Sequence, residues 1–335
     1  MSAPVNEIRT RATWKPAAAL LWAAVGMLST APGNAQTANA PVLEVPAHSV
    51  PVPSTVSPQM AKIIGLPLRT NWNVLPKTGE EWKPVADAGA ANTIKNIPGI
   101  SERLHVKVDK TVIDGVRAFL ITPEVIAPEN RNRLLIHVHG GCYVLNPGEA
   151  ALPEAMFMAG FGHFKVIAVD YRMPPEAYFP AALDDGMTVY KNAIRTTDPK
   201  NIAIFGSSAG GALTLEMILK AKQDGLPLPG AIAPGTPMSD VTKIGDTFVT
   251  NAMLDNVLVS PDGFCDAGTK VYANGHDLKD PLLRVHRKLR QAGVEAMLQV
   301  YEGQSHAQYY RDDTSPEARE AFEEIAGFFN KHLGK

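Results

Sequence analysis

Residues 202–211 read IAIFGSSAGG, an apolar run that leads directly into a Gly-x-Ser-x-Gly turn. A helix-compatible stretch, residues 212–219, follows at once. A serine at such a strand-to-helix turn sits on a strained backbone that projects its hydroxyl out of the sheet. The first N–H groups of the following helix point at the same place. This order of elements predicts that Ser208 is a nucleophile and not part of an ordinary Gly/Ser-rich loop.

A second glycine-containing turn follows another apolar run. Residues 134–138 read LLIHV, which predicts a strand buried on both faces. The run ends in His139-Gly140-Gly141, and two adjacent glycines can turn successive N–H groups toward one point, as an anion requires. Alone, this pattern is equally well explained as a plain glycine turn. Together with the Ser208 turn downstream, it predicts an oxyanion hole.

The rest of the sequence alternates strand-like runs with helix-compatible stretches. We expect an edge hairpin over residues 104–121 that turns at Asp109-Lys110, followed by strands at 134–138, 166–172, 201–205, 231–237 and 295–301. Helices are expected at 180–194, 212–219, 284–291 and 317–333. Strand–helix–strand order implies parallel strands joined by right-handed crossovers. The sequence therefore predicts an α/β fold with a mostly parallel sheet of at least six strands, flanked by helices.

The first hundred residues have a different character. Arg9, Arg11 and Lys15 precede the short apolar run 17–28, and the small residues 33–35 offer a cleavage site. We expect residues 1–35 to be a signal peptide, the mature chain to begin at Gln36, and the protein to be exported, periplasmic or secreted. An uncleaved anchor is the alternative. Residues 36–100 are expected to form an extended arm with helical pieces at 60–66 and 80–91, which either cap an active site or pack on the sheet. The α/β domain would span residues 101–335.

Composition excludes several classes of function. The net charge is −2 and no basic block occurs, so nucleic acid is not an expected partner. No further stretch is long and apolar enough for stable membrane insertion. Neither a metal-ligand spacing nor a G-x-G-x-x-G after a strand is present. An exported chain could join Cys142 to Cys265, but Cys142 lies in the glycine turn, and we expect two free, buried thiols.

Taken together, the motifs resemble the hormone-sensitive-lipase-like branch of the α/β-hydrolases. They are His139-Gly140-Gly141, the GSSAG of residues 206–210, Gly303-x-x-His306, the PAALDD of residues 180–185, and the RVHRKLRQAGV of residues 284–294. The resemblance covers the chain from about Leu104 to its C-terminus. It implies an α/β-hydrolase fold and a carboxylesterase or lipase that acts on small-molecule esters without metal or organic cofactor.

The chemistry assigns a role to each site residue. Ester hydrolysis needs a hydroxyl nucleophile, a base to take its proton, and donors for the tetrahedral oxyanion. Ser208 would attack the carbonyl carbon, while His306 would act as base and then protonate the leaving alcohol. The N–H groups of Gly140, Gly141 and Ala209 would hold the oxyanion, at about 3 kcal/mol per donor.

The third member of the expected triad is missing from its usual place. The resemblance puts the acid after a strand that precedes the Arg284 helix, but no apolar run of strand length occurs between Val259 and Leu283. The chain therefore lacks one strand before Arg284, together with the acid at its tip. Asp277 is the first substitute and Asp240 the second, although each is also explained as a capping or solvated carboxylate.

Two functions follow from these observations. The first is a serine carboxylesterase for short or medium acyl esters, or lactones, acting through Ser208. The second is a catalytically impaired hydrolase-like protein that at most binds small apolar ligands, since loss of a triad acid costs on the order of 10⁴ in rate. A peptidase would use the same triad, but nothing in the sequence indicates peptide specificity.

Overall fold

A six-stranded mixed sheet runs through the computed structural model of the chain, which describes residues 44, 46–238, 247–276 and 285–335. Its strands lie in the order β1-β2-β4-β3-β5-β6, in which β4, β3, β5 and β6 are parallel while β1 and β2 are antiparallel to their neighbours. Their bounds are β1 Val106–Ile113, β2 Val116–Pro123, β3 Leu134–Val138, β4 Val166–Val169, β5 Ile202–Ser207 and β6 Ala231–Gly235. The expected α/β fold with a parallel centre is confirmed.

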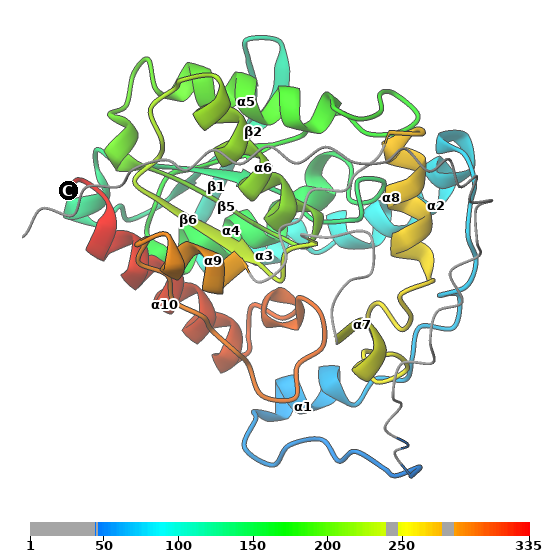
Figure 1. The fold of residues 1–335 in the computed structure, drawn as a ribbon. Coiled ribbons are helices and arrows are strands. Elements are labelled where there is room, and N and C mark those ends of the chain that lie inside the picture. The colour runs from blue at the N-terminus through cyan, green and yellow to red at the C-terminus, as the bar shows by residue number, and fades with distance from the viewer. Residues whose placement is uncertain (1–43, 45, 239–246, 277–284) are drawn as a thin grey trace, which may run out of the picture. The chain divides into compact units, whose positions relative to one another are not determined.

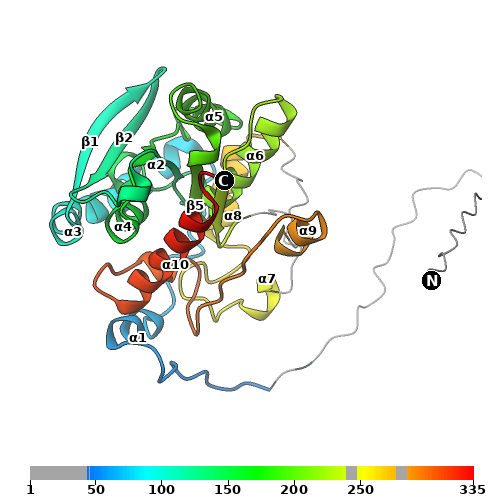
Figure 2. The same cartoon turned by 90° about the vertical axis from the view of Figure 1, so that its left-hand side faces the viewer.

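Two groups of helices cover opposite faces of this sheet (Figures 1 and 2). Helices α3, α4 and α10 pack on one face with Leu135 and Phe205, whereas α5 and α6 pack on the other with Ile136 and Ile204. Alternate residues of β3 and β5 thus enter different cores, as the period of two in a strand requires. The helices are α1 Pro58–Ile64, α2 Gly79–Ile94, α3 Ile97–Leu104, α4 Leu152–Gly162, α5 Ala181–Ala193, α6 Ala209–Gln223, α7 Thr247–Thr250, α8 Phe264–Ala273, α9 Val285–Gln291 and α10 Pro316–His332.

Local sequence signals explain where several helices begin. Ser57 precedes Pro58 at the start of α1, and its hydroxyl accepts a hydrogen bond from the Met60 N–H. Ser315 caps α10 in the same way, with proline at the first helical position. Such caps satisfy N–H groups that have no partner inside the helix. The closing helix expected at 317–333 is therefore confirmed, with its start one residue earlier.

The edge hairpin is confirmed, but its expected turn is wrong. Strand β1 continues through Asp109 and Lys110, and the chain reverses at Asp114-Gly115, where φ is 47° and 88°. An Asp-Gly pair with two positive φ angles matches the twist of a two-residue hairpin, whereas Asp109-Lys110 does not supply it. The hairpin joins eight residues of β1 to eight of β2 and forms one edge of the sheet.

The strand expected at 295–301 is also wrong. These residues form no helix or strand, and Met297, Leu298 and Val300 are 63%, 65% and 82% exposed. A strand needs a neighbour for its ladder of hydrogen bonds. Between β6 and residue 295, the described residues contain no strand that could provide one. Strand β6 is accordingly the outermost strand of the described sheet on that side.

The N-terminal region is described only in part. Residues 1–43 and 45 lie outside the described residues, and the expected signal peptide lies there with them. Residue 44 and residues 46–50 form no helix or strand, and 51–335 form a separate compact unit. The helical pieces expected at 60–66 and 80–91 correspond to α1 and α2. Within the described part of the chain, no helix is long and apolar enough to cross a membrane.

Candidate active site

Ser208 occupies the turn between β5 and α6 with φ 60° and ψ −121°. A non-glycine residue with positive φ is uncommon and strained, and it persists where the surrounding structure enforces it. A Cβ on Gly206 or on Gly210 would overlap the backbone oxygen of Val138, so only glycine fits on either side. The Ser208 side chain makes no capping hydrogen bond to α6. The hydroxyl therefore stays available while the backbone of the turn is fixed.

The glycine turn after β3 lies directly on the serine turn. A Cβ built on Gly140 would lie 2.6 Å from the Ser207 carbonyl oxygen and 3.2 Å from Ser208 Cβ. Any side chain larger than hydrogen would push the two turns apart. Gly140 and Ser208, which are far apart in sequence, are thus brought into contact as expected for an oxyanion hole.

Hydrogen bonds fix the orientation of the two peptide groups that precede Gly140 N and Gly141 N. The His139 carbonyl accepts from the Tyr171 hydroxyl at 2.7 Å, and Asn146 Nδ2 donates to the Gly140 carbonyl at 3.0 Å. His139 Nδ1 lies 2.8 Å from the same Gly140 oxygen. In a planar trans peptide the N–H points away from the carbonyl. Among the described residues, no hydrogen bond uses the N–H of Gly140 or Gly141. Both donors are thus oriented and unoccupied.

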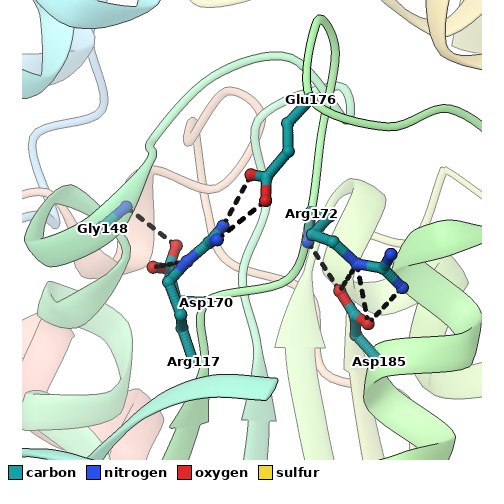
Figure 3. A network of polar contacts seen from close by, with 6 residues as sticks. All are labelled: Arg117, Gly148, Asp170, Arg172, Glu176 and Asp185. Atoms are coloured by element: carbon teal, nitrogen blue, oxygen red, sulfur yellow. Dashed lines mark hydrogen bonds and ion pairs between the residues drawn. The ribbon is translucent and has the colours of Figure 1, made fainter. Parts of the chain in front are cut away.

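The segment after β4 supports this turn. The Tyr171 ring stacks on the His139 ring with centroids 4.0 Å apart. Its two neighbours in sequence, Asp170 and Arg172, are held by ion pairs (Figure 3). Asp170 accepts from Arg117 Nε at 3.1 Å and from the Gly148 N–H at 3.0 Å, and Arg172 pairs with Asp185 at 2.7 Å. Tyr171 is therefore anchored on both sides, so its hydroxyl holds the His139 carbonyl in one position.

The expectation of two free thiols is wrong, because Cys142 and Cys265 form a disulfide. Helix α8 packs over the loop that follows Gly141. The Cα atoms of Cys142 and Cys265 are 5.2 Å apart. Trp82 of α2 joins Cys142 and Cys265 in one buried apolar cluster. The sequence separation of 123 residues hides this proximity. The crosslink ties the glycine turn to α8, and α2 packs beside it.

His306 lies in the loop before the short 3-10 helix Gln308–Tyr310. Its Nε2 atom is buried and has no hydrogen-bond partner in the described part of the chain. The pKa of His306 is lowered to about 4, mainly by burial, while nearby Asp255 opposes the shift and Arg311 adds to it. The imidazole is therefore neutral at neutral pH and able to accept a proton. No described hydrogen bond joins Ser208 to His306, so their close approach stays a prediction.

Asp255 is the carboxylate that the structure brings to this loop. Its Oδ2 atom accepts from the His306 backbone N–H at 3.1 Å, and its Oδ1 atom accepts from the N–H groups of Val257 and Leu258. The side chain thus fixes the loop backbone and does not hydrogen-bond to the imidazole. Sequence reasoning missed Asp255, because it sits in an irregular segment without any motif.

The two acids chosen from the sequence, Asp277 and Asp240, lie outside the described residues. Within residues 44, 46–238, 247–276 and 285–335, no carboxylate is hydrogen-bonded to the His306 ring. In the same part of the chain, no group of three or more His, Cys, Asp or Glu residues is arranged to hold a metal ion. The described residues therefore include a serine turn in contact with oriented backbone donors, and, in a separate loop, a neutral histidine.

Comparisons with known proteins identify the fold and the family of the chain. A family model for the alpha/beta hydrolase fold matches residues 135–287. The crystal structure of an esterase, E25, matches with a TM-score of 0.83 and 37% identity, covering 87% of this chain and 99% of that one. An acetyl-hydrolase of Streptomyces hygroscopicus is 28% identical over 163 residues, 48% of this chain and 54% of that protein. Hormone-sensitive lipase of Mus musculus is 27% identical over 186 residues, 52% of this chain and 24% of the lipase.

These matches differ in extent. The chain spans about half the length of the acetyl-hydrolases it matches, but nearly the whole of esterase E25. The family model and the 37% identity to E25, over nearly the whole of that protein, identify the same family. The chain belongs to the α/β-hydrolase fold family, among the esterases related to hormone-sensitive lipase.

Proposed function

We propose that this chain is a serine carboxylesterase that hydrolyses short or medium acyl esters, or lactones, through an acyl-enzyme on Ser208. The observation that carries the proposal is the contact between the strained Ser208 turn and the glycine turn, whose two N–H groups are oriented and make no hydrogen bond to any described residue. Donors fixed in advance stabilise the charge that develops on the ester oxygen. The N–H of Ala209, the first residue of α6, would be the third donor.

The proposed reaction uses these groups in order. Ser208 Oγ attacks the ester carbonyl carbon and transfers its proton to His306 Nε2. The carbonyl oxygen becomes an oxyanion held by the N–H groups of Gly140, Gly141 and Ala209. The leaving alkoxide takes the proton from His306 and departs as an alcohol. A water molecule then repeats the attack on the acyl-enzyme, releasing the carboxylic acid and free Ser208.

One observation favours the alternative, a catalytically impaired hydrolase. A histidine with a pKa of about 4 is a weak base, and a carboxylate on its ring would raise that pKa. Among the described residues, none supplies such a carboxylate. The alternative therefore predicts a protein that turns esters over slowly and at most binds small apolar ligands.

Hydrolysis of p-nitrophenyl esters over a series of acyl lengths separates the two functions. An active esterase should lose most of its turnover in Ser208→Ala, and an organophosphate should label Ser208 in the wild type. The exposed Ser54 provides a matched control, so Ser54→Ala should retain full activity. Unchanged turnover in Ser208→Ala would refute the assignment. Turnover near the uncatalysed rate in the wild type would support the impaired hydrolase.

The acid can be found with three single variants on the same ester. We expect Asp277→Asn to cut turnover by orders of magnitude, since a histidine without a carboxylate partner adopts the wrong tautomer. Asp240→Asn is the second candidate. Asp255→Asn serves as a comparison, because its carboxylate holds the loop backbone of His306 and not the ring. Full activity in all three variants would refute the assignment of Asp277 or Asp240 as the acid.

We also propose that the protein is exported. The charged and apolar runs at the start of the sequence support this, and so does the disulfide between Cys142 and Cys265, since disulfides persist in oxidising compartments. Cell fractionation tests the proposal. Recovery of the protein only from the cytoplasm, with two free thiols, would contradict it.

A further inference from the structure

A cluster of buried polar side chains lies beside the nucleophile turn and takes no part in the reaction above. It consists of Glu154, His137, Ser207 and Tyr309, which are 5%, 0%, 0% and 5% exposed. The four residues come from α4, β3, β5 and the short 3-10 helix Gln308–Tyr310. We refer to them below as the Glu154 cluster.

Hydrogen bonds connect the whole Glu154 cluster. Ser207 Oγ donates to Glu154 Oε1, and His137 Nε2 lies 3.1 Å from Glu154 Oε2. Tyr309 is hydrogen-bonded to Ser207 Oγ. Because the single hydroxyl hydrogen of Ser207 goes to the carboxylate, Tyr309 must be the donor to Ser207. The hydrogen bonds therefore run in one direction, from the Tyr309 hydroxyl to Ser207 and from Ser207 to the Glu154 carboxylate. His137 donates to the second oxygen of that carboxylate.

The surrounding backbone leaves room for these side chains and little more. A Cβ on Gly235, the last residue of β6, would lie 2.5 Å from Ser207 Oγ and would overlap the Tyr309 hydroxyl. Strand β6 can run past the cluster only because this position is glycine. Glu154 also lies in the first turn of α4, where the helix dipole favours a negative charge.

Each partner of Glu154 is close in sequence to a different part of the site. His137 is two residues before His139-Gly140, Ser207 precedes Ser208, and Tyr309 is three residues after His306. Burial of a carboxylate is costly unless it is paired, and an apolar residue would fill the same space without that cost. Glu154 is the single charged residue in α4, whose other buried residues are apolar or glycine.

We propose that Glu154 is a positioning residue of the esterase, which fixes the Ser208 turn relative to the His306 loop by holding Ser207 and, through Ser207, Tyr309. The inference rests on the proposed function, since it concerns the geometry of that reaction. The Glu154 cluster joins the loop of the base to the turn of the nucleophile, two segments that no other described hydrogen bond between their side chains connects. Glu154 itself would touch neither substrate nor reacting atoms.

The test is a double-mutant cycle of Glu154→Gln and Tyr309→Phe, assayed with p-nitrophenyl butyrate. Each single change should lower kcat about tenfold with little change in KM, since each removes or weakens one buried hydrogen bond that orients reacting groups. The double variant should lose no more than the worse single variant, because Tyr309 acts through the same chain as Glu154. Tyr190→Phe is the matched control, since Tyr190 is buried on the opposite face and donates to Pro227 O.

Amide hydrogen exchange of residues 304–311 provides a readout that does not require turnover. Exchange there should rise in Glu154→Gln and Tyr309→Phe but not in Tyr190→Phe. Unchanged exchange, unchanged kcat or losses in kcat that simply multiply would each overturn the proposal. An inactive wild type would instead refute the proposed function, and raised exchange in the two variants would then still establish the structural tie between the loop and the turn.

Discussion

Removal of the Cys142–Cys265 disulfide should lower both stability and turnover. The bond closes a loop of 123 residues. In the chain-entropy description, a loop of that length restricts the unfolded state by about 5 kcal/mol at 25 °C, and measured losses for native disulfides are typically about 2–5 kcal/mol. We therefore expect Cys142→Ala/Cys265→Ala to lower the free energy of unfolding by about 2–5 kcal/mol. Alanine avoids placing a new hydroxyl in this buried cluster.

Turnover should fall as well, because the disulfide follows Gly141 directly and ties the glycine turn to α8. A loosened turn would orient its N–H donors less well, which should appear as a lower kcat with KM nearly unchanged.

Urea unfolding and p-nitrophenyl butyrate hydrolysis measure the two effects. Treatment of the wild type with a phosphine reductant should reproduce the loss of stability, and the same treatment should leave the double alanine variant unchanged. The reasoning is refuted if reductant does not move the wild-type midpoint, or if two thiols titrate in unfolded protein that has not been reduced.

Three further outcomes are expected. Burial lowers the pKa of His139 and of His306 from 6.5 to about 4, so the unfolded chain binds more protons and stability should fall as the pH drops from 6.5 to 4. For two protons the slope is at most about 2.7 kcal/mol per pH unit, and a flat urea-unfolding profile across that range would contradict it. Gly210→Ala would place a Cβ against a backbone oxygen of β3 and should prevent stable folding, whereas Gly327→Ala, with open space in α10, should raise the melting temperature slightly. Tyr171→Phe removes the hydrogen bond to the His139 carbonyl and should lower kcat about tenfold, with a change in KM alone arguing against the oriented glycine turn.

Much of the fold could be predicted because it depends on local patterns. The continuous apolar runs at Leu134–Val138 and Ile202–Ser207 belong to strands buried on both faces, and the sequence carries that signal directly. The failures concern interactions between distant segments. Residues 295–301 have the composition of a strand, yet a strand also needs a neighbour, and none lies between them and β6 in the described residues. The hairpin turns at Asp114-Gly115 and not at the expected Asp109-Lys110, because the Asp-Gly pair supplies the two positive φ angles that a two-residue hairpin turn needs.

The residues of the candidate site also fall into those that the sequence indicates and those that it does not. Ser208, Gly140 and Gly141 stand in motifs whose geometry follows from short-range backbone constraints, so the sequence indicates both the residues and their contact. The disulfide and Asp255 depend on how loops cross in space, and no spacing in the sequence reports that. Glu154 offered one usable signal, because it is the single charge in the otherwise apolar helix Leu152–Gly162. A lone carboxylate in such a run indicates a buried partner.

The lack of a strand at residues 295–301 has a consequence for how the protein behaves at high concentration. Among the described residues, β6 has no strand on its outer side, and an open strand edge invites pairing with other molecules. Pro234 in β6 has no amide hydrogen, so only the first part of that strand could add a neighbour. The greater hazard is residues 297–301, MLQVY, a β-prone and uncharged peptide with exposed apolar side chains. Glu295 and Glu302 flank it, as charged residues that guard aggregation-prone segments usually do. These two carboxylates, which have no part in the proposed reaction, would thus limit association through this segment.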